Sequence, residues 1–314
     1  MLRQARPAGR IRFDLLQLPF AVTRRARLLS GVTVLEAIQK SADFLGKKGV
    51  ESSRLNAELL LAHLLKMPRM KLYLNFERAL SAAETDGLRE FVKRRGQREP
   101  LQHITGSTSF CGLEIFVNRH ALVPRPETEM LAELGWQFLS TLNSQPSTAL
   151  DFGTGTGCIA VALAVKCPNA KIYALDISAD ALALVQQNAL QNKVAERIEF
   201  FCGDGFAALP EKIKVDLIIS NPPYIASAEI ETLQPEVKDF DPRAALDGGA
   251  DGLDFYRRLA AEAKNFLKPD GKIMVEFGDG QADAIKNLFE SEKWIVEAVQ
   301  ADYSHRARIL VARR

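Results

Sequence analysis

The chain has 314 residues, of which 47% are hydrophobic and 25% charged, and its formal net charge at pH 7 is +2. This length is typical of about two domains, and the composition is that of a soluble globular protein without a run of ~20 apolar residues for a membrane span. Residues 1–31 contain seven Arg and one Asp, so the remainder carries 34 basic and 38 acidic side chains. This acidic balance disfavours a protein built to bind nucleic-acid phosphates, and we expect no direct nucleic-acid partner.

Residues 1–31 form a basic, acid-poor extension. Such a segment is typical of a transit peptide, but a flexible extension or a start codon placed too far upstream explains it equally well. The four cysteines lack C-x-x-C spacing and the four histidines form no i, i+4 pair, so we expect reduced thiols and no metal site. The expected location is the cytoplasm, with import into an organelle if the extension is native.

Residues 32–98 are predicted to form a small helical domain. Four segments each carry one apolar face, and the last follows the capping-box pattern Ser81-x-x-Glu84. Four short amphipathic helices can bury these faces only against one another. Partner recognition is the expected role of this bundle, and a purely structural role is the alternative.

A linker with a β-hairpin is predicted over residues 99–125. Residues 101–118 are rich in Thr, Phe, Ile and Val, and Gly106 and Gly112 interrupt them. The proline-stiffened stretch HALVPRPETE (120–129) follows and is the predicted boundary. The third domain is therefore expected over residues 126–314, beginning with a helix.

From residue 148 onward, apolar strands alternate with helices. Repeated βα units predict a mostly parallel, doubly wound sheet covered on both faces. The last two strands are joined without a helix, which predicts an antiparallel edge strand. Ligands of such a fold bind beyond the carboxyl ends of the strands.

Three successive predicted strands end in groups suited to a nucleoside cofactor. The first ends in a G-x-G-x-G loop within residues 151–157, where glycines let a ligand approach the main chain at a helix N-terminus. The second ends at Asp176, whose carboxylate can accept both ribose hydroxyls, and the third ends in Gly203-Asp204-Gly205-Phe206, with an aromatic ring where an adenine would lie. The predicted cofactor-binding residues are Asp151, Gly153, Thr154, Gly155, Thr156, Gly157, Asp176, Asp204, Gly205, Phe206 and Asn221.

This order of motifs resembles the S-adenosylmethionine-dependent methyltransferases of the Rossmann-like class. The resemblance implies that the loop 153–157 passes under the methionine part of the cofactor, that Asp176 binds its ribose and that the turn 204–206 borders its adenine. A nicotinamide dehydrogenase is the alternative at this stage, although the glycine spacing differs from G-x-G-x-x-G.

The fourth strand runs into Asn221-Pro222-Pro223-Tyr224. In isolation this is a turn after a buried strand, because prolines cannot continue a central strand. After the fourth strand of this fold it resembles the motif of methyltransferases that alkylate a planar NH₂ group. The Asn221 side-chain oxygen and the Pro222 carbonyl can accept the two N–H bonds, and Tyr224 can pack on the planar group. We therefore predict Asn221, Pro222 and Tyr224 as catalytic residues, and Asn221, Pro222, Pro223 and Tyr224 as the substrate site.

Longer sequence stretches around these motifs indicate which class of NH₂ group is methylated. Residues 98–131 and 235–257, together with the motifs between them, resemble the HemK/PrmC family of protein-(glutamine-N5) methyltransferases, and the resemblance covers about residues 33–314. It implies methylation of the glutamine in the Gly-Gly-Gln motif of peptide chain release factors, with the helical domain holding the release factor. Gly205 stands where some relatives carry an aromatic residue, which leaves the adenine contact there open. The junction 120–129, which contains the charge cluster 125–129, is expected to border the cofactor pocket, with no individual role assigned to the charged residues.

Three alternatives stay open. The substrate could be a glutamine of a ribosomal protein, or an adenine or cytosine of DNA, although the acidic body of the chain disfavours DNA. A scaffold that binds release factors without catalysis is the third, and the intact Asn221 disfavours it. We expect the enzyme to be a monomer.

Overall fold

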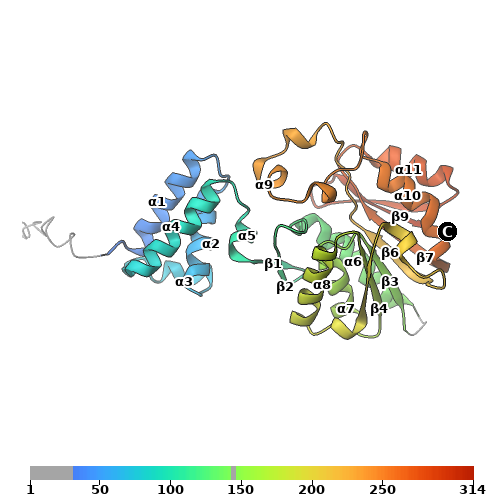
Figure 1. The fold of residues 1–314 in the computed structure, drawn as a ribbon, viewed down its shortest axis with the longest axis horizontal. Helices are drawn as coiled ribbons and strands as arrows, with labels where there is room; N and C mark the ends of the chain where they lie inside the picture. Colours follow the sequence, from blue (N-terminus) through green and yellow to red (C-terminus); the bar gives the residue numbers. More distant parts are fainter. Residues whose placement is uncertain (1–30, 143–145) are drawn as a thin grey trace, which may run out of the picture.

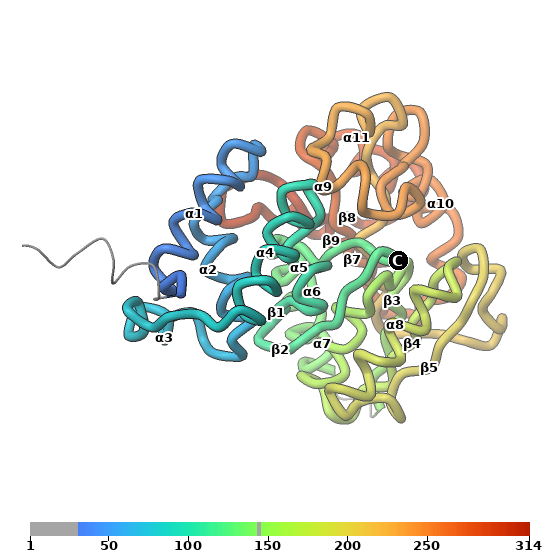
Figure 2. The backbone as a smooth tube through the Cα atoms, turned by 60° about the vertical axis from the view of Figure 1, so that its left-hand side comes forward, coloured from blue at the N-terminus to red at the C-terminus, as the bar shows by residue number. Residues whose placement is uncertain are grey.

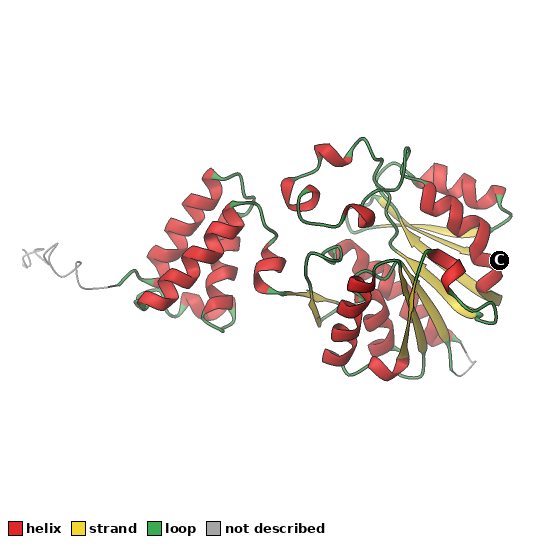
Figure 3. Cartoon of the chain, in the orientation of Figure 1, coloured by secondary structure: helices red, strands yellow, loops and turns green. Residues whose placement is uncertain are grey.

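The structure is a computed structural model that describes residues 31–142 and 146–314. The basic extension predicted over residues 1–31 thus lies, except for Gly31, outside the described residues. A helical bundle stands beside a larger part built on a seven-stranded sheet (Figures 1 and 3). Within the described ranges, no helix has the length and apolar character needed to cross a membrane.

Two helices of the N-terminal bundle begin with capping boxes, of which the sequence predicted the one at Ser81. Both Thr33 with Glu36 and Ser81 with Glu84 form capping boxes, which satisfy free N–H groups where two of the helices begin. Apolar side chains such as Val34, Leu45, Leu60, Leu61 and Leu72 form a separate buried cluster between the helices. The helices are α1 (Val34–Lys47), α2 (Ser53–Leu64), α3 (Arg69–Tyr73) and α4 (Ala82–Gly96).

The linker differs from the prediction in its first part. Residues expected to open a hairpin instead form the short helix α5 (Leu101–Thr105), which ends at Gly106 in the left-handed region. The reason is packing, because Leu101 and Ile104 join the apolar cluster of the bundle. The hairpin itself follows as the antiparallel strands β1 (Ser107–Phe110) and β2 (Leu113–Phe116), and Figure 2 traces this path from α4 to β2.

The seven-stranded sheet has the order β5-β4-β3-β6-β7-β9-β8, and its first five strands are parallel. The edge strand β8 pairs antiparallel with β9, as predicted, and β9 is itself inserted between β7 and β8. The chain runs from β3 outward to β5 and then returns to β6 on the other side of β3, which creates the switch point where ligands bind in such folds. The strands are β3 (Thr148–Phe152), β4 (Lys171–Asp176), β5 (Ile198–Cys202), β6 (Val215–Ser220), β7 (Leu267–Glu276), β8 (Ile295–Ala301) and β9 (Ala307–Arg313).

Helices cover both faces of the sheet, so alternate residues of each strand enter different cores. In β3, Ala149 packs against the helices of one face, and Leu150 packs against those of the other. The first face is covered by α6 (Pro126–Thr141), α7 (Cys158–Lys166) and α8 (Ala179–Gln191), and the second by α10 (Asp254–Glu262) and α11 (Ala282–Ser291).

An ion-pair cluster joins the bundle to the sheet domain. Glu236, in the short helix α9 (Pro235–Lys238), accepts hydrogen bonds from Arg95 Nη2 at 2.8 Å and from Arg98 Nη2 at 2.5 Å. The Arg95 side chain is only 8% exposed. Burial would raise the pKa of Glu236, but the two guanidinium groups hold it below its usual value.

Replacing Glu236 with Gln is expected to lower the free energy of unfolding by about 1–3 kcal/mol, because the nearly buried Arg95 charge loses its counterion. Urea denaturation measures the change. Glu231→Gln is the matched control, since Glu231 is 68% exposed and its nearest cations are 3.7 and 3.8 Å away. Equal stability of the two variants would contradict a structural role for the cluster.

Candidate active site

The carboxyl ends of four neighbouring parallel strands meet at one cavity of about 370 Å³. Each of the four predicted strand ends contributes to its wall: Gly153 and Gly155 follow β3, Asp176 ends β4, Asp204 and Gly205 follow β5, and Asn221 follows β6. The remaining wall residues are His120, Phe152, Leu175, Ile177, Ser178, Ala181, Gly203, Pro223, Pro242, Ala244, Ala245, Asp247, Phe255 and Arg258.

The glycine loop owes its shape to residues that do not themselves line the cavity. The buried Asp151 accepts hydrogen bonds from Thr154 Oγ1 at 2.7 Å and from the Ala160 amide at 3.1 Å. Gly157 has φ +76°, and a Cβ there would lie 2.4 Å from Val185, so only glycine fits. Asp151, Thr154, Thr156 and Gly157 thus build the loop, whereas Gly153 and Gly155 face the cavity.

Asn188 fastens this loop to the hairpin. Its fully buried side chain donates to the Thr156 carbonyl at 2.9 Å and to the Phe116 carbonyl at 3.0 Å, and it accepts from the Phe116 amide at 2.7 Å. All of its polar atoms are therefore engaged in holding β2 against the loop.

Asp176 links the second strand end to the loop. Its Oδ2 accepts from the Gly155 amide at 2.8 Å and its Oδ1 from the Ser178 amide at 2.9 Å. A carboxylate has about four acceptor positions, so two remain for hydroxyl groups in the cavity. This arrangement suits the ribose of a nucleoside.

The third strand end differs from the prediction at Phe206. Its ring does not line the cavity: it is 2% exposed and stacks on Phe266 with ring centroids 4.9 Å apart. Apolar surface for an adenine is offered by other side chains, among them Ile177, which is 64% exposed, and Phe255. The prediction failed because the turn after β5 directs Phe206 into the core under the sheet.

Gly205 does line the cavity, and its φ of +63° favours glycine. A Cβ at position 205 would lie 2.4 Å from the Arg258 guanidinium, which forms an ion pair with Asp204. The space that a larger residue would fill at this strand end is therefore taken by Arg258.

The predicted S-adenosylmethionine fits these residues. The cavity combines a carboxylate at Asp176, apolar walls and a main-chain approach at Gly153, where a Cβ would meet no atom within 4 Å. Gly153, Gly155, Asp176, Asp204 and Gly205 would hold the cofactor. Among the described residues, no group of three or more His, Cys, Asp or Glu side chains could bind a metal ion.

A second cavity, of about 220 Å³, adjoins the first, and Asn221 lines both. Pro222 and Tyr224 line the second cavity and Pro223 the first, so the four predicted substrate residues stand at the junction. The second cavity is completed by Leu122, Arg125, Ile225, Leu233, Val237, Ala245 and Leu246.

The 221–224 loop is supported by close backbone packing. Gln281 Nε2 donates to the Tyr224 carbonyl at 2.9 Å, and Gly252, with φ +76°, approaches so closely that a Cβ would lie 2.4 Å from the same oxygen. The Tyr224 side chain is half-buried, and burial raises the pKa of its hydroxyl. The ring is thus a rigid wall that stays neutral at physiological pH.

Two residues at this site escaped the sequence analysis. Asn221 Nδ2 donates to Thr128 Oγ1 at 3.0 Å, and both side chains lie near Glu276, the last residue of β7. Burial raises the pKa of Glu276 to about 7, against the opposing effect of the Thr128 hydrogen bond. Glu276 could have been predicted as a site residue, because it is a carboxylate at the end of a strand next to β6. Thr128 could not, because it lies within the charge cluster 125–129, where nothing distinguishes it.

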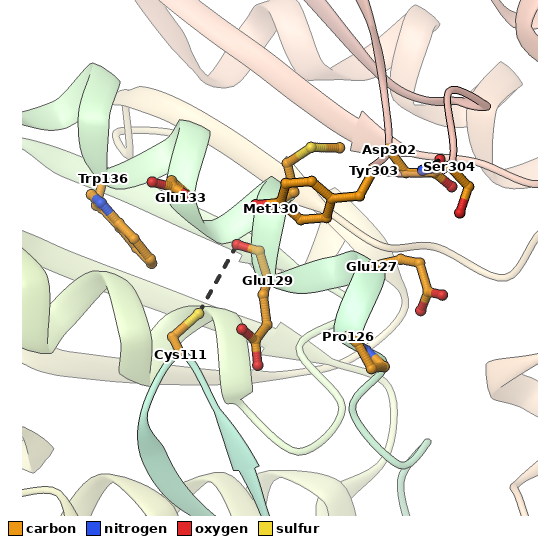
Figure 4. A pocket seen from close by; sticks show the side chains of 10 residues that line it. All are labelled: Cys111, Pro126, Glu127, Glu129, Met130, Glu133, Trp136, Asp302, Tyr303 and Ser304. Atoms are coloured by element: carbon orange, nitrogen blue, oxygen red, sulfur yellow. Dashed lines mark hydrogen bonds between the residues drawn. The ribbon is translucent and has the colours of Figure 1, made fainter.

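The residues of the proline-stiffened junction 120–129, which contains the charge cluster 125–129, lie in different surroundings. Arg125 lines the second cavity and forms an ion pair with the buried Asp241 at 2.8 Å. Glu127 and Glu129 line a separate pocket with Tyr303, and Figure 4 shows their side chains on its wall. The junction thus borders the cofactor cavity through His120, whereas its charged residues line the two other pockets.

Asp151 gives a prediction about pH. Burial raises the pKa of Asp151 to about 7, so the folded cofactor-free protein binds this proton more tightly than the unfolded chain. The stabilising contribution is complete below about pH 4 and is lost as pH rises through 7. Relative to Asp151→Asn, the wild type should lose roughly 1 kcal/mol per pH unit between pH 5 and 7. Urea denaturation from pH 5 to 8 measures this, and a constant difference would contradict it.

Two family models match parts of the chain. Residues 36–106 match the model of the PrmC N-terminal domain, and residues 135–236 match that of the methyltransferase small domain. Over 259 residues the chain is 44% identical to the release factor glutamine methyltransferase of Geobacter sulfurreducens, with 82% of this chain and 88% of that protein covered. The enzyme of the same name from Chlorobaculum tepidum is 39% identical over 278 residues, covering 87% and 94%.

A solved structure is also similar: that of a release factor-specific protein-(glutamine-N5) methyltransferase from Alicyclobacillus acidocaldarius. It shares 28% identity at a TM-score of 0.37, and the match covers 60% of this chain and 93% of that one. The two relatives above extend over both parts of the fold and most of their own length. The family predicted from the sequence is thereby confirmed: the chain belongs to the release factor glutamine methyltransferases.

Proposed function

We propose that this protein transfers a methyl group from S-adenosylmethionine to the side-chain amide nitrogen of the glutamine in the Gly-Gly-Gln motif of peptide chain release factors, giving N5-methylglutamine. The observation that carries this proposal is the position of Asn221, which lines the cofactor cavity and the adjoining cavity at once. A substrate amide held at Asn221 in the second cavity therefore lies next to the cofactor cavity, as direct methyl transfer requires.

Asn221 and Pro222 orient the nitrogen that is methylated. An amide nitrogen is a weak nucleophile because its lone pair is delocalised, so its alignment matters more than its deprotonation. Asn221 Oδ1 and the Pro222 carbonyl accept its two N–H bonds and aim the nitrogen at the cofactor cavity. These acceptors also stabilise the positive charge that develops on the N–H groups, and one proton then leaves to water. Bound S-adenosylmethionine supplies the electrophilic methyl group.

Tyr224 and the two prolines shape the pocket for a planar amide. The Tyr224 ring, held by its surroundings, offers a flat apolar wall for stacking. Pro222 and Pro223 lack N–H groups, so this segment cannot continue β6 as a central strand, and the Pro222 carbonyl stays available to the substrate. Asp176 holds the ribose, while Gly153 and Gly155 approach the methionine part and Asp204 and Gly205 border the adenine.

The family relationship supports a release factor as substrate, and the helical bundle is the proposed site that holds it. Since release factors act on ribosomes, we place the enzyme in the cytoplasm. We also propose a monomer as the active form.

The decisive experiment incubates the protein with S-adenosylmethionine and purified release factor, then measures the mass of the Gly-Gly-Gln peptide. The expected gain is one methyl group on the glutamine. Parallel incubations with ribosomes and with duplex DNA test the alternative substrates, a glutamine of a ribosomal protein and the amino group of adenine or cytosine. Methylation of either one, with an unmodified release factor, would overturn the proposal.

A further inference from the structure

The polar contacts of Asn221 lead away from the cavities to two buried residues. Its Nδ2 donates to Thr128 Oγ1 at 3.0 Å, and the Glu276 carboxyl group is a hydrogen-bonding neighbour of both the Thr128 and the Asn221 side chains. Thr128 and Glu276 are each 3% exposed. Thr128 belongs to α6 and Glu276 ends β7, so the three residues come from three elements. No described residue bonds to Glu276 Oε2, which leaves a buried acceptor facing inward.

The Thr128 hydroxyl can either donate a hydrogen bond to the Asn221 amide or accept one from it, and the charge state of Glu276 decides which. A hydroxyl has one donor and can also accept. When Glu276 is ionised it only accepts, so the Thr128 hydroxyl donates to it and can then only accept from Asn221. The amino group of Asn221 must therefore face Thr128, and the oxygen of the same amide must face the cavities.

We propose that Thr128 and Glu276 are positioning residues that fix the Asn221 amide with its oxygen toward the substrate nitrogen. The inference rests on the proposed function, in which that oxygen accepts a substrate N–H bond. Were the amide turned over, its amino group would meet the amino group of the substrate, and two donors would face one another. We call the contacts Glu276–Thr128–Asn221 the relay. It determines whether the site can accept the N–H bonds of an NH₂ group.

Because Glu276 can gain or lose a proton, the orientation of the Asn221 amide depends on pH. Burial raises its pKa to about 7, so both charge states occur near neutrality. Protonated Glu276 can donate to Thr128, which can then donate to the Asn221 oxygen and favour the reversed amide. kcat should therefore rise as pH increases through 7. The other titratable groups around Glu276 are Glu127 of α6, Arg308 of β9, Tyr224 of the loop after β6 and Tyr256 of α10, whose hydroxyl donates to the Glu276 carbonyl at 2.7 Å.

Three variants of α6 test the relay through steady-state kinetics with release factor. Thr128→Val keeps the shape but removes the hydroxyl, and we expect kcat to fall roughly tenfold while the Kd for cofactor stays unchanged. Thr128→Ser restores the hydroxyl and should stay within about twofold of the wild type. Thr141→Val is the matched control, because Thr141 is exposed at the far end of the same helix. A wild-type kcat for Thr128→Val, or equal loss in the Val and Ser variants, would overturn the proposal.

Glu276→Gln provides an independent readout that also serves if Thr128→Val does not fold. The rise of kcat through pH 7 should disappear in this variant, whereas Thr128→Ser should keep it. An unchanged pH profile in Glu276→Gln would refute the relay. Failure of the proposed function looks different: Asn221→Ala would stay active, or the wild type would leave release factor unmodified.

Discussion

Asn221→Ala should lower kcat for release factor methylation by on the order of 100-fold or more while leaving the cofactor Kd nearly unchanged. The reason is geometric: the substrate nitrogen loses the acceptor that orients it, and removal of one such preorganised group from other enzymes costs about 10²–10³ in rate. Asn221 is one of 20 residues that line the cofactor cavity, and three further strand ends contribute to the same wall. Rapid-quench single-turnover kinetics measures the rate of transfer, and calorimetric titration with S-adenosylhomocysteine measures cofactor binding.

Asn287→Ala is the matched control for this variant, because Asn287 is exposed on α11 and belongs to neither cavity. It should retain full activity. A large loss of cofactor affinity in Asn221→Ala, with transfer unimpaired at saturating cofactor, would show that Asn221 serves the cofactor and not the substrate amide.

The sequence allowed the prediction of the catalytic framework because parallel strands place their carboxyl ends together. Once β3, β4, β5 and β6 were identified as neighbours in one sheet, Gly153, Asp176, Asp204 and Asn221 had to meet at one edge. No side-chain detail was needed for that step. The same reasoning could not show that Asn221 would line two cavities, since the second wall comes from residues 233–246, which form no strand.

The errors share a physical cause, namely that local pattern does not specify side-chain direction in turns. Phe206 follows the third strand end but packs on Phe266 in the core, and its prediction as an adenine contact was wrong. Leu101 and Ile104 were assigned to a hairpin by composition, yet tertiary packing on the bundle makes that stretch helical. Thr128 acquires its role only through a contact with Asn221, 93 residues away.

Asp176→Ala should weaken cofactor binding on the order of 100-fold, because the cavity loses charged acceptors for two hydroxyl groups and each such bond is worth about 1.5–3 kcal/mol. The change also removes the acceptor of the Gly155 and Ser178 amides, so the glycine loop is less firmly placed. Calorimetric titration with S-adenosylhomocysteine gives the Kd directly. At saturating cofactor, kcat should recover most of its wild-type value, in contrast to Asn221→Ala.

Two further variants separate the charge of Asp176 from its position in the fold. Asp176→Asn keeps the shape and one acceptor oxygen, so its loss of affinity should be intermediate, at about tenfold. Asp270→Ala, a change at an exposed position of β7 that lines neither cavity, should bind as the wild type does. If Asp176→Ala bound cofactor normally but had a low kcat, the carboxylate would act on the transfer step itself. The Asp176 variant should lose cofactor affinity and the Asn221 variant should lose the rate of transfer. This difference is expected if the cofactor and the substrate amide bind side by side at the carboxyl ends of neighbouring strands.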